Sequence, residues 1–332
     1  MKKILICDYP SALEHSYETT FDALKKSMGE AFFDYEIEVC AYENDDVLIN
    51  QLNGVVGLIT GFLEIGENIL SKAAELKCIS VSAVGYGNID CSAAKAHNVT
   101  VCHIEEYCTE EVAEHTIALI SALNRNLKYY NNHVEIDKQW KYHTISGGRT
   151  LSRQTLGIFG YGRIGRRVAQ LAKAFGMKVI VVDPYVSEEA VAGTGVEIVS
   201  ADELFERADV ITNHMNLTND NLHYFRQETF SKMKRHPIFI NVGRGGCVKE
   251  DDLAKALDDG IIRGAGLDVL DAEEPDLEQC FFTNRDNVIL TPHCAFYSND
   301  SIDALQRISG ENMGYFLTDK ADKIYSIVKE CR

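Results

Sequence analysis

The stretch LGIFGYGRIGRR, residues 156–167, places three glycines between an apolar run and an amphipathic run. The apolar run predicts a strand, the amphipathic run predicts a helix, and KVIVVD at 178–183 predicts the next strand. In such a unit Gly160 permits a tight turn, Gly162 lets backbone approach a pyrophosphate, and Gly165 allows close packing of helix on strand. The pattern GxGxxG is weak by itself, but this context predicts a dinucleotide-binding turn.

Asp183 closes the second strand and indicates which cofactor is preferred. A carboxylate at this position accepts hydrogen bonds from the hydroxyls of the adenine ribose and repels a 2′-phosphate. Backbone amides at the start of the helix would face the phosphates, assisted by the helix dipole. We therefore expect NAD rather than NADP. The alternative is a glycine-rich turn that binds no ligand.

The composition is that of an ordinary globular protein of about two domains, with 332 residues, 45% hydrophobic and 25% charged. Its 33 basic residues are outnumbered by 50 acidic residues, and the net charge of -17 disfavours nucleic acid and anionic membranes as partners. The N-terminal apolar run is too short for a signal peptide, and no run is long enough to cross a membrane, so we expect a cytoplasmic protein. Ten cysteines without a CxxC pair favour reduced core thiols over a disulfide framework, and no metal is expected.

Short apolar runs alternate with helical patterns, which is typical of parallel sheets covered on both faces. A first series predicts strands at 3–8, 35–42, 55–60, 78–84 and 99–104. After a loop at 145–154, a second series predicts strands at 155–160, 178–183, 209–215, 238–243, 264–270 and 287–293. The main helices are expected at 67–76, 109–130 with Thr109 as its cap, 163–175, 201–208, 221–234, 249–259 and 298–317. The sequence therefore predicts two doubly wound α/β units.

Polar side chains follow three of the later strands, at the edge where a doubly wound sheet binds its ligands. Arg244 lies in NVGRGG, Glu273 and Glu274 lie in DAEEP, and His293 lies in TPHCAFY. The arginine can hold a carboxylate and polarise the neighbouring oxygen, the histidine can exchange a hydroxyl proton, and the glutamate can orient the histidine. This set suits hydride transfer between a nicotinamide and a 2-hydroxy acid.

Each of these residues also has a structural alternative. The arginine could form a surface ion pair, the acids could lie in a solvated loop, and His293 could be a satisfied structural histidine. Their joint placement favours the catalytic interpretation. His103, His115 and His214 have no comparable setting, and Cys294 is expected to pack beside His293 rather than act as a nucleophile.

The motifs GYGRIGRRVA, NVGRGG, GLDVL with EEP, and TPH resemble the signatures of the D-isomer-specific 2-hydroxyacid dehydrogenases. The resemblance is dense from about Ser82 to Tyr297 and includes features of the C-terminal-binding-protein branch and of D-lactate dehydrogenases. It implies that a Rossmann nucleotide domain, 104–296, is inserted into a flavodoxin-like substrate domain made of 1–103 and 297–332. The active site would then lie in the cleft between these domains.

The resemblance also implies a role for each motif residue. Arg244, Glu273 and His293 would be catalytic, and Asp268 would meet the nicotinamide amide. Substrate would be bound by Ala83, Val84, Gly85, Arg244, Phe296 and Tyr297. NAD would be bound by Thr109, Gly160, Gly162, Arg163, Ile164, Gly165, Asp183, His214, Met215, Asn216, Thr218, Val242, Gly243, Asp268, His293 and Ala295. Gly87 and Asn216 depart from family usage, where Asp and Pro are common.

Two alternatives stay open. The first concerns the glutamate: counting from Asp268 gives Glu273, which we prefer, whereas counting back from Pro275 gives Glu274. The second concerns the function, because relatives include NAD(H)-sensing scaffolds with corepressor-like roles. The family resemblance further implies a homodimer formed through the nucleotide domain, while the identity of the 2-hydroxy acid is not indicated.

Overall fold

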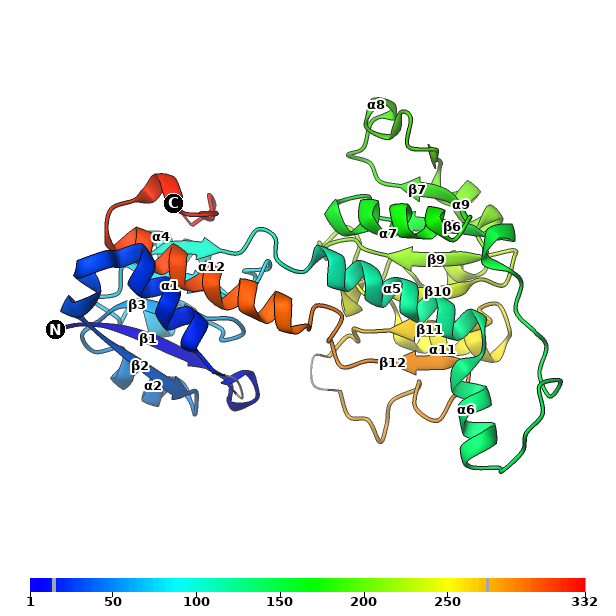
Figure 1. Cartoon of the computed structure of the whole chain (residues 1–332), viewed down its shortest axis with the longest axis horizontal. Coiled ribbons are helices and arrows are strands. Elements are labelled where there is room, and N and C mark those ends of the chain that lie inside the picture. Colours follow the sequence, from blue (N-terminus) through cyan, green and yellow to red (C-terminus); the bar gives the residue numbers. More distant parts are fainter. Residues whose placement is uncertain (14–15, 273–274, 332) are drawn as a thin grey trace. The chain divides into compact units, whose positions relative to one another are not determined.

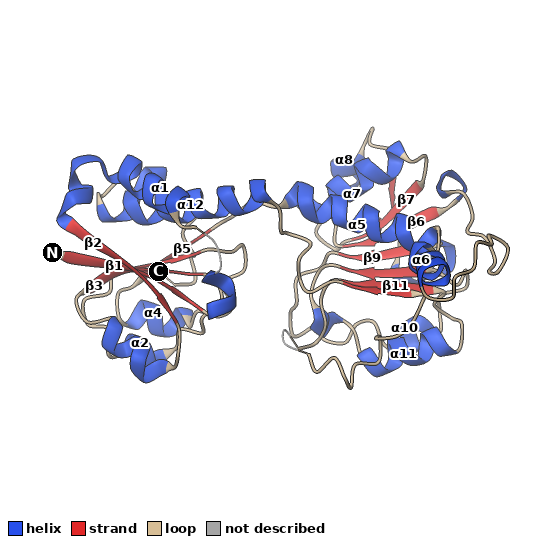
Figure 2. Cartoon of the chain, turned by 60° about the horizontal axis from the view of Figure 1, so that its bottom comes forward, coloured by secondary structure: helices blue, strands red, loops and turns tan. Residues whose placement is uncertain are grey.

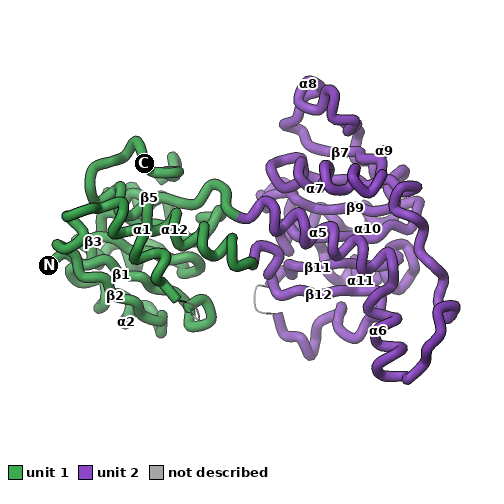
Figure 3. The backbone as a smooth tube through the Cα atoms, in the orientation of Figure 1, with its two compact units in different colours: residues 1–107, 298–332 green, residues 108–297 purple. Residues whose placement is uncertain are grey.

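The computed structural model describes residues 1–13, 16–272 and 275–331 of the chain. It divides into two compact units, which Figure 3 shows in different colours. Unit 1 is formed by Met1–Tyr107 and Ser298–Arg332, and unit 2 is formed by Cys108–Tyr297. Both ends of the chain therefore belong to one unit, and the other unit is a continuous segment.

The connections between the units lie slightly beyond the boundaries expected at 103/104 and 296/297. Ile104 stays with unit 1 because its side chain is fully buried and its amide donates to the Ala83 carbonyl at 3.0 Å. Tyr297 stays with unit 2 because its amide donates to the Cys294 carbonyl at 2.9 Å. Packing of the residues that follow a strand therefore sets each boundary, rather than the strand end itself.

Unit 1 contains a five-stranded parallel sheet with the order β2-β1-β3-β4-β5. This order is that of a flavodoxin-like sheet, and it reverses between β1 and β3. The strands are β1 Lys2–Asp8, β2 Tyr35–Ala41, β3 Val55–Thr60, β4 Cys78–Val81 and β5 Thr100–His103. All of them fall within or beside the runs predicted from the sequence.

The helices of unit 1 are α1 Glu18–Met28, α2 Asp45–Gln51, α3 Glu67–Leu70, α4 Cys91–Ala96 and α12 Asn299–Leu317. Figure 2 shows α1 and α12 on one face of the sheet, and α2 and α4 on the other. The alternation of side chains along β1 supplies both layers, since Ile4 and Ile6 join the core with Met313 of α12, whereas Leu5 and Cys7 join the opposite core. A sheet buried on both faces follows, as the continuous apolar runs predicted.

The helix predicted at 67–76 is shorter than expected. Only the single turn α3 is helical, and residues 71–76 form turns. The Ser71 hydroxyl donates to the Glu67 carbonyl at 2.6 Å, a local bond of the kind that competes with continued helix.

One cysteine pair contradicts the expectation of reduced thiols. Cys91, the first residue of α4, forms a disulfide with Cys331, and their Cα atoms are 4.3 Å apart. The two residues are separated by 240 positions, so no local spacing pattern indicates the bond. Folding of the C-terminal segment onto unit 1 brings them together. The other cysteines are free.

Unit 2 contains a seven-stranded parallel sheet with the order β12-β11-β10-β9-β6-β7-β8 (Figure 1). Counted from β6, this is the Rossmann order with one further strand, and it reverses between β6 and β9. The strands are β6 Thr155–Phe159, β7 Lys178–Val182, β8 Val196–Ile198, β9 Val210–Asn213, β10 Ile238–Asn241, β11 Gly264–Leu267 and β12 Val288–Leu290. The sequence did not predict β8, because three residues make too short a pattern.

The helices of unit 2 are α5 Thr109–Asn124, α6 Leu127–Glu135, α7 Arg163–Ala174, α8 Glu188–Val191, α9 Ala201–Arg207, α10 Gln227–Phe230 and α11 Glu250–Asp258. Figure 2 shows α5 and α7 on one face of the sheet, and α10 and α11 on the other. Ser200 and Glu203 form a capping box at the start of α9. None of the described helices combines the length and apolarity needed to cross a membrane.

Three helix predictions for unit 2 need correction. The helix expected at 109–130 breaks after α5, because Asn126 takes a left-handed conformation with φ 53°. Thr109 is the first residue of α5, and Cys108 occupies the cap position. The helix expected at 221–234 is reduced to α10, because the Phe225 amide donates to the Cys247 carbonyl at 2.9 Å and that backbone is held in a bridge instead.

Candidate active site

The glycine-rich turn lies where the strand order of unit 2 reverses, between β6 and β9. Gly160 follows β6 with φ +86°, a conformation that favours glycine. A Cβ at Gly160 would lie 2.8 Å from the carbonyl carbon of His214, which follows β9. The turn therefore requires glycine for its backbone conformation and for the close approach of the neighbouring loop.

The other two glycines of the motif shape the start of α7. Gly165 lies so close to the Gly160 carbonyl that a Cβ would clash with it, so the helix packs tightly on the turn. Gly162 occupies the cap position of α7, and a Cβ there would meet no described atom within 4 Å. Open space before a helix N-terminus is what an anionic phosphate group needs.

Asp183 lies directly after β7 and bonds to this same turn. Its Oδ2 accepts the Tyr161 amide at 2.7 Å, and its Oδ1 accepts the Tyr185 amide at 2.9 Å. A carboxylate has about four acceptor sites, so both oxygens keep capacity for further donors. The carboxylate predicted to face a ribose therefore also fixes the backbone between Gly160 and Gly162.

His214 lies in the loop after β9 with both ring nitrogens buried and without a partner among the described residues. Burial lowers the pKa of His214 to about 3, which keeps the imidazole neutral at physiological pH. Met215 is half-buried, whereas Asn216 and Thr218 are exposed. The Asn221 side chain holds these two exposed residues by donating to the Asn216 carbonyl and accepting the Thr218 amide.

Two buried asparagines connect the loops that follow β9 and β10. The Asn213 side-chain amide donates to Asn241 Oδ1 at 3.0 Å, and the same oxygen accepts the Gly243 backbone amide at 3.2 Å. Asn213 Oδ1 in turn accepts the Met215 amide at 3.1 Å. The pair therefore fixes the loop from His214 and the loop that leads through Val242 and Gly243 to the arginine motif.

Arg244 is the exposed residue of an otherwise buried segment, 241–248. Its carbonyl accepts the Asn241 side-chain amide at 3.0 Å, and its Nη1 donates to the Gly243 carbonyl at 2.8 Å. The backbone is thus held on both sides while the guanidinium reaches solvent at the carboxyl end of β10. Such a side chain can present its planar fork to a carboxylate.

His293 follows β12 in a left-handed conformation with φ 50°. Its amide donates to the carbonyls of Asp268 and Thr291 at 2.8 and 3.0 Å. A non-glycine residue in this region is held there only by its surroundings. The ring of Phe296 lies edge-on to the imidazole, with 6.3 Å between ring centroids, and the next ring, Tyr297, is exposed.

Asp268 supplies those surroundings from the end of β11. Its side chain is buried, and its carboxylate accepts the Thr291 hydroxyl at 2.5 Å and the amides of Cys294 and Ala295 at 3.0 Å each. These bonds bracket His293 on both sides. The contact between Asp268 and the nicotinamide amide stays a prediction, and in this structure three acceptor sites of the carboxylate hold the histidine loop.

His115 of α5 joins the same network, although the sequence showed no setting for it. Its Nε2 lies 3.0 Å from Thr291 Oγ1 and 3.6 Å from Asp268 Oδ1. His115, Asp268 and Cys294 are close enough together to suggest metal ligands. However, amides and a hydroxyl occupy the carboxylate, and burial, followed by the charge of Asp268, raises the pKa of Cys294 and keeps its thiol protonated. We interpret the cluster as hydrogen-bonded support for the loop.

In unit 1, the predicted substrate loop follows β4. Ala83 is tied to β5 through the Ile104 amide, and Val84 is exposed, with its carbonyl 2.9 Å from His103 Nδ1. The loop ends at Asn88, whose side chain donates to the carbonyls of Gly61 and Leu63. Both ends of the loop are therefore fixed to the segments that directly follow β3 and β5 of the same sheet.

The remaining predicted residues are placed as follows. Arg163 and Ile164 form the first turn of α7, and Thr109 starts α5. Glu273 and Glu274 lie outside the described residues, so the choice between them stays a prediction.

Residues 117–295 match the family model described as D-isomer specific 2-hydroxyacid dehydrogenase, NAD binding domain. The chain belongs to this family. The match covers the seven-stranded sheet from β6 to β12, so unit 2 carries the NAD-binding domain of a D-2-hydroxyacid dehydrogenase, as the motifs predicted.

Individual relatives support the same assignment. The chain is 33% identical over 307 residues to the glycerate dehydrogenase of Methylorubrum extorquens, covering 88% of this chain and 93% of the relative. It is 38% identical over 236 residues to the D-3-phosphoglycerate dehydrogenase of Bacillus subtilis, covering 71% of this chain but only 44% of that relative. Among solved structures, the D-lactate dehydrogenase of Aquifex aeolicus complexed with NAD and lactic acid matches with a TM-score of 0.83 and 30% identity, covering 97% of each chain.

Sequence reasoning missed the supporting residues of this D-2-hydroxyacid dehydrogenase. Asn213 and Asn241 each end a buried strand, and a polar amide at such a position is a signal that could have been used. His115 gave no such signal, because its partners Thr291 and Asp268 are remote in sequence.

Proposed function

We propose that the chain reduces a small 2-oxo acid to the (R)-2-hydroxy acid with NADH and catalyses the reverse reaction with NAD. The arrangement after β10, β11 and β12, which are neighbours in the sheet, carries this proposal. Arg244 is exposed after β10, and buried Asp268 after β11 holds the loop of His293 after β12. A cation and an imidazole at one edge of an NAD-binding sheet suit a substrate with a carboxylate and an oxygen that exchanges a proton.

The residues around the glycine turn fit NAD. The start of α7 with Gly162 would receive the pyrophosphate, and Asp183 keeps acceptor sites for the ribose hydroxyls beside its bond to Tyr161. The ring nitrogens of neutral His214, which have no partner within the described part of the chain, offer a donor and an acceptor to the bound cofactor. NADH, when bound, supplies the hydride that C2 of the oxo acid accepts.

The polar residues of unit 2 then have distinct tasks. The Arg244 guanidinium holds the carboxylate and polarises the C2 oxygen of the oxo acid. Protonated His293 donates its proton to that oxygen, and in the reverse reaction the neutral imidazole removes it. Glu273 supports the imidazolium, and Asp268 fixes the backbone that carries it.

Unit 1 contributes carboxylate recognition in this proposal. The amides of Val84 and Gly85 bind the substrate carboxylate, and the exposed position of Val84 supports this assignment. Phe296 and Tyr297, next to His293, form an apolar wall for the substrate side chain. Lactate, glycerate and phosphoglycerate dehydrogenases are all among the similar proteins, so the proposal names the class of acid and not one acid.

A panel of oxo acids tests the proposal. NADH oxidation is measured with pyruvate, hydroxypyruvate, glyoxylate, 2-oxoisocaproate and phenylpyruvate, for the native chain and for His293→Asn. Asparagine tolerates the left-handed backbone, so the variant removes the proton donor and keeps the fold. We expect turnover of at least one acid, lost in the variant with NADH binding retained. NADH-dependent capture of a protein partner without turnover of any acid would favour the scaffold alternative.

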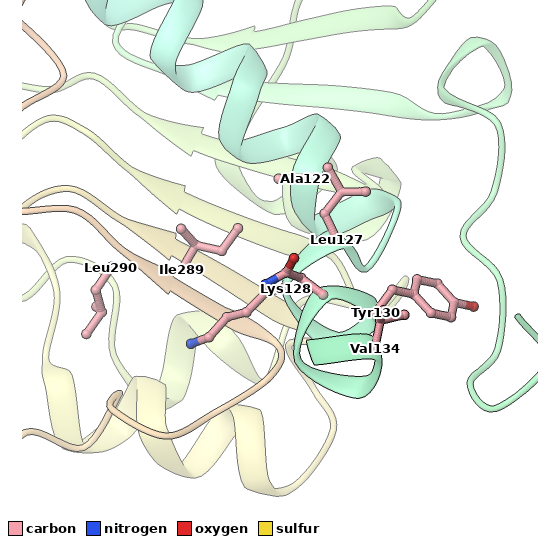
Figure 4. Close-up of a pocket in the computed structure, with 8 residues that line it drawn as sticks. Ala122, Leu127, Lys128, Tyr130, Val134, Ile289 and Leu290 are labelled. Carbon is pink, nitrogen blue, oxygen red and sulfur yellow. The ribbon is translucent and has the colours of Figure 1, made fainter. Parts of the chain in front are cut away.

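We further propose that unit 2 mediates a homodimer. A groove of about 850 Å³ lies along α5, α6 and β12 (Figure 4), lined by Ala122, Leu127, Lys128, Tyr130, Asn131, Val134, Ile289 and Leu290. The segment after α6 exposes large apolar side chains, Ile136, Trp140 and Tyr142. A patch of this kind marks an interface, and a second copy could exchange these side chains across a twofold axis.

Sedimentation velocity tests the dimer. The native chain should sediment as a dimer, and Trp140→Ser should shift it towards monomer. Phe33→Ser, which removes an exposed aromatic ring from unit 1, is the matched control and should leave the dimer intact. A native monomer at micromolar concentration would contradict the proposal.

A further inference from the structure

The C-terminal tail, defined here as residues 324–331, continues the sheet of unit 1 beyond β5. The His103 amide donates to the Ser326 carbonyl at 3.2 Å, and the Val328 amide donates to the Val101 carbonyl at 2.9 Å. An antiparallel bridge joins Cys102 and Ile327 between them. The tail therefore covers the edge of the sheet and, as Figure 1 shows in red, ends near α4.

The tail is anchored at its start and at its end. At the start, the Tyr325 hydroxyl donates to Glu311 at 2.8 Å, and its amide donates to Asn312 Oδ1 at 2.9 Å. At the end, Cys331 is buried in the core of unit 1 and is joined to Cys91 by the disulfide. The disulfide is thus the covalent fastening of the distal half of the tail.

Two residues of the tail, Ser326 and Glu330, are connected to the predicted substrate loop, which comprises residues 83–88. His103 lies between the loop and the tail, with Nδ1 2.9 Å from the Val84 carbonyl and Nε2 2.9 Å from the Ser326 hydroxyl. A neutral imidazole satisfies both partners if Nδ1 donates to the carbonyl and Nε2 accepts from the hydroxyl. The imidazole therefore connects Ser326 to Val84, and a shift of Ser326 would disturb the contact with the Val84 carbonyl.

The second connection runs through Tyr86. Its ring lies edge-on to His103 with 5.0 Å between centroids, and its hydroxyl donates to Glu330 at 3.4 Å. Burial and the adjacent Glu330 carboxylate raise the pKa of Tyr86, so the phenol stays protonated and remains a donor. Glu330 precedes Cys331, which makes this contact dependent on the fastened end of the tail.

We propose that the tail is a redox-sensitive clamp, in which the Cys91–Cys331 disulfide keeps Ser326 and Glu330 against the substrate loop and its reduction weakens binding of the oxo acid. The effect on substrate rests on the proposed function, because it requires the amides of Val84 and Gly85 to bind the carboxylate. The coupling between the tail and the loop is independent of the proposed function. Ser326, His103 and Glu330 are positioning residues, since they act through the loop.

The reductant in this proposal is a small dithiol. One of its thiolates attacks the sulfur of half-buried Cys91, the Cys91–Cys331 bond breaks, and Cys331 leaves as a thiolate that takes up a proton. The second thiol, once deprotonated, attacks the mixed disulfide and releases Cys91, which is also protonated. Two electrons and two protons pass to the protein, and the dithiol becomes a cyclic disulfide.

Three other thiols of unit 1, those of Cys7, Cys40 and Cys78, are poor nucleophiles for this chemistry. Burial raises the pKa values of the Cys7, Cys40 and Cys78 thiols, so these thiols stay protonated and unreactive. These three thiols are therefore unsuited to exchange with the Cys91–Cys331 pair.

Hydrogen exchange provides the first test, because it needs no substrate. Amide exchange of segments 83–89 and 324–331 is followed by mass spectrometry in the oxidised chain, after dithiothreitol and alkylation, and in Cys91→Ser. Both segments should exchange faster without the disulfide. Cys280→Ser, a half-buried free cysteine of unit 2, is the control and should exchange like the native chain. Unchanged exchange of 83–89 after reduction would overturn the clamp.

Kinetics on the same samples provides the second test. Loss of the disulfide should raise KM for the oxo acid about three- to tenfold, with kcat changed less than about twofold and NADH affinity unchanged, as expected when one or two hydrogen bonds that position a binding loop are lost. Faster exchange without a change in KM would overturn the assignment of the loop to the carboxylate and the effect on activity, while the clamp itself would stand on the exchange data.

A third variant keeps the disulfide and covers the case in which Cys91→Ser misfolds. Ser326→Ala removes only the hydroxyl that faces His103. It should raise KM about two- to fivefold without faster exchange at Cys331, and Ser326→Thr, which keeps the hydroxyl, should restore the native value. Equal KM values for alanine and threonine would remove His103 from the proposal.

Discussion

The Asp183 carboxylate accepts the backbone amide of Tyr161 at 2.7 Å, so the residue expected to choose the cofactor also fastens the glycine turn. Its other oxygen accepts the Tyr185 amide at 2.9 Å. Removing the side chain would therefore change two things at once: the charge that faces a 2′-phosphate and the backbone that faces the pyrophosphate. Only a substitution that keeps the acceptor oxygen can separate them.

We predict that the native chain uses NADH about a hundredfold more efficiently than NADPH in kcat/KM, because a 2′-phosphate beside a partly desolvated carboxylate costs a few kcal/mol. Asp183→Asn keeps an acceptor for Tyr161 and should reduce this preference about tenfold. Asp183→Ala loses the acceptor as well and should lower the efficiency with both cofactors. Equal use of NADH and NADPH by the native chain would refute the role of the charge.

Arg244→Lys should lose most activity while NADH binds nearly as before. Lysine keeps the positive charge but lacks the planar fork that can hold a carboxylate and an adjacent oxygen together, so we expect a loss of about a hundredfold in kcat/KM. Steady-state kinetics beside a fluorescence titration of NADH measures both quantities. A variant with near-native kcat/KM would show that Arg244 serves only the structure of its loop.

The extent of successful prediction differs between the fold and the site. The strand runs and the glycine turn were predictable because buried parallel strands and a backbone approached by phosphate impose local patterns. The break after Asn124 and the shortness of α10 were not, because the left-handed Asn126 and the pairing of Phe225 with Cys247 depend on tertiary contacts.

The same distinction applies within the site. Arg244 and His293 stand in short motifs that carry their own signal. The residues that hold them, Asn241, Asp268 and His115, act through partners far away in the sequence. The Cys91–Cys331 disulfide is the extreme case, because 240 positions separate its two cysteines. The prediction that the cysteines are reduced core thiols was therefore wrong for this pair.

His214 predicts an acid sensitivity of the fold. Its pKa is lowered to about 3 in the folded chain, below the value of 6.5 expected when unfolded. The unfolded chain therefore binds an extra proton between these values, and stability falls as the pH drops from 6.5 towards 3, by up to about 1.4 kcal/mol per pH unit. Urea unfolding at pH 7.5, 6 and 5 should show this slope, and His214→Phe should flatten it. Identical slopes in both proteins would exclude His214 as the cause.

The last prediction concerns the glutamate that supports His293. Counting from Asp268, where β11 has just ended, selects Glu273, because a strand end fixes position while the following loop can absorb an extra residue. Counting back from Pro275 selects Glu274. Both lie outside the described residues, so kinetics must decide between them.

Glu273→Gln should lower kcat/KM for hydroxy-acid oxidation and move the acidic limb of its pH profile to lower pH. A neutral amide supports the imidazolium less well than a carboxylate, so a higher proton concentration is needed to block the base. Glu274→Gln changes the same charge one residue away and is the matched control, with both quantities expected to stay nearly native. The reverse pattern would assign the role to Glu274 and place the inserted residue before it, and a native profile in both variants would leave the support of His293 to the Asp268 network alone.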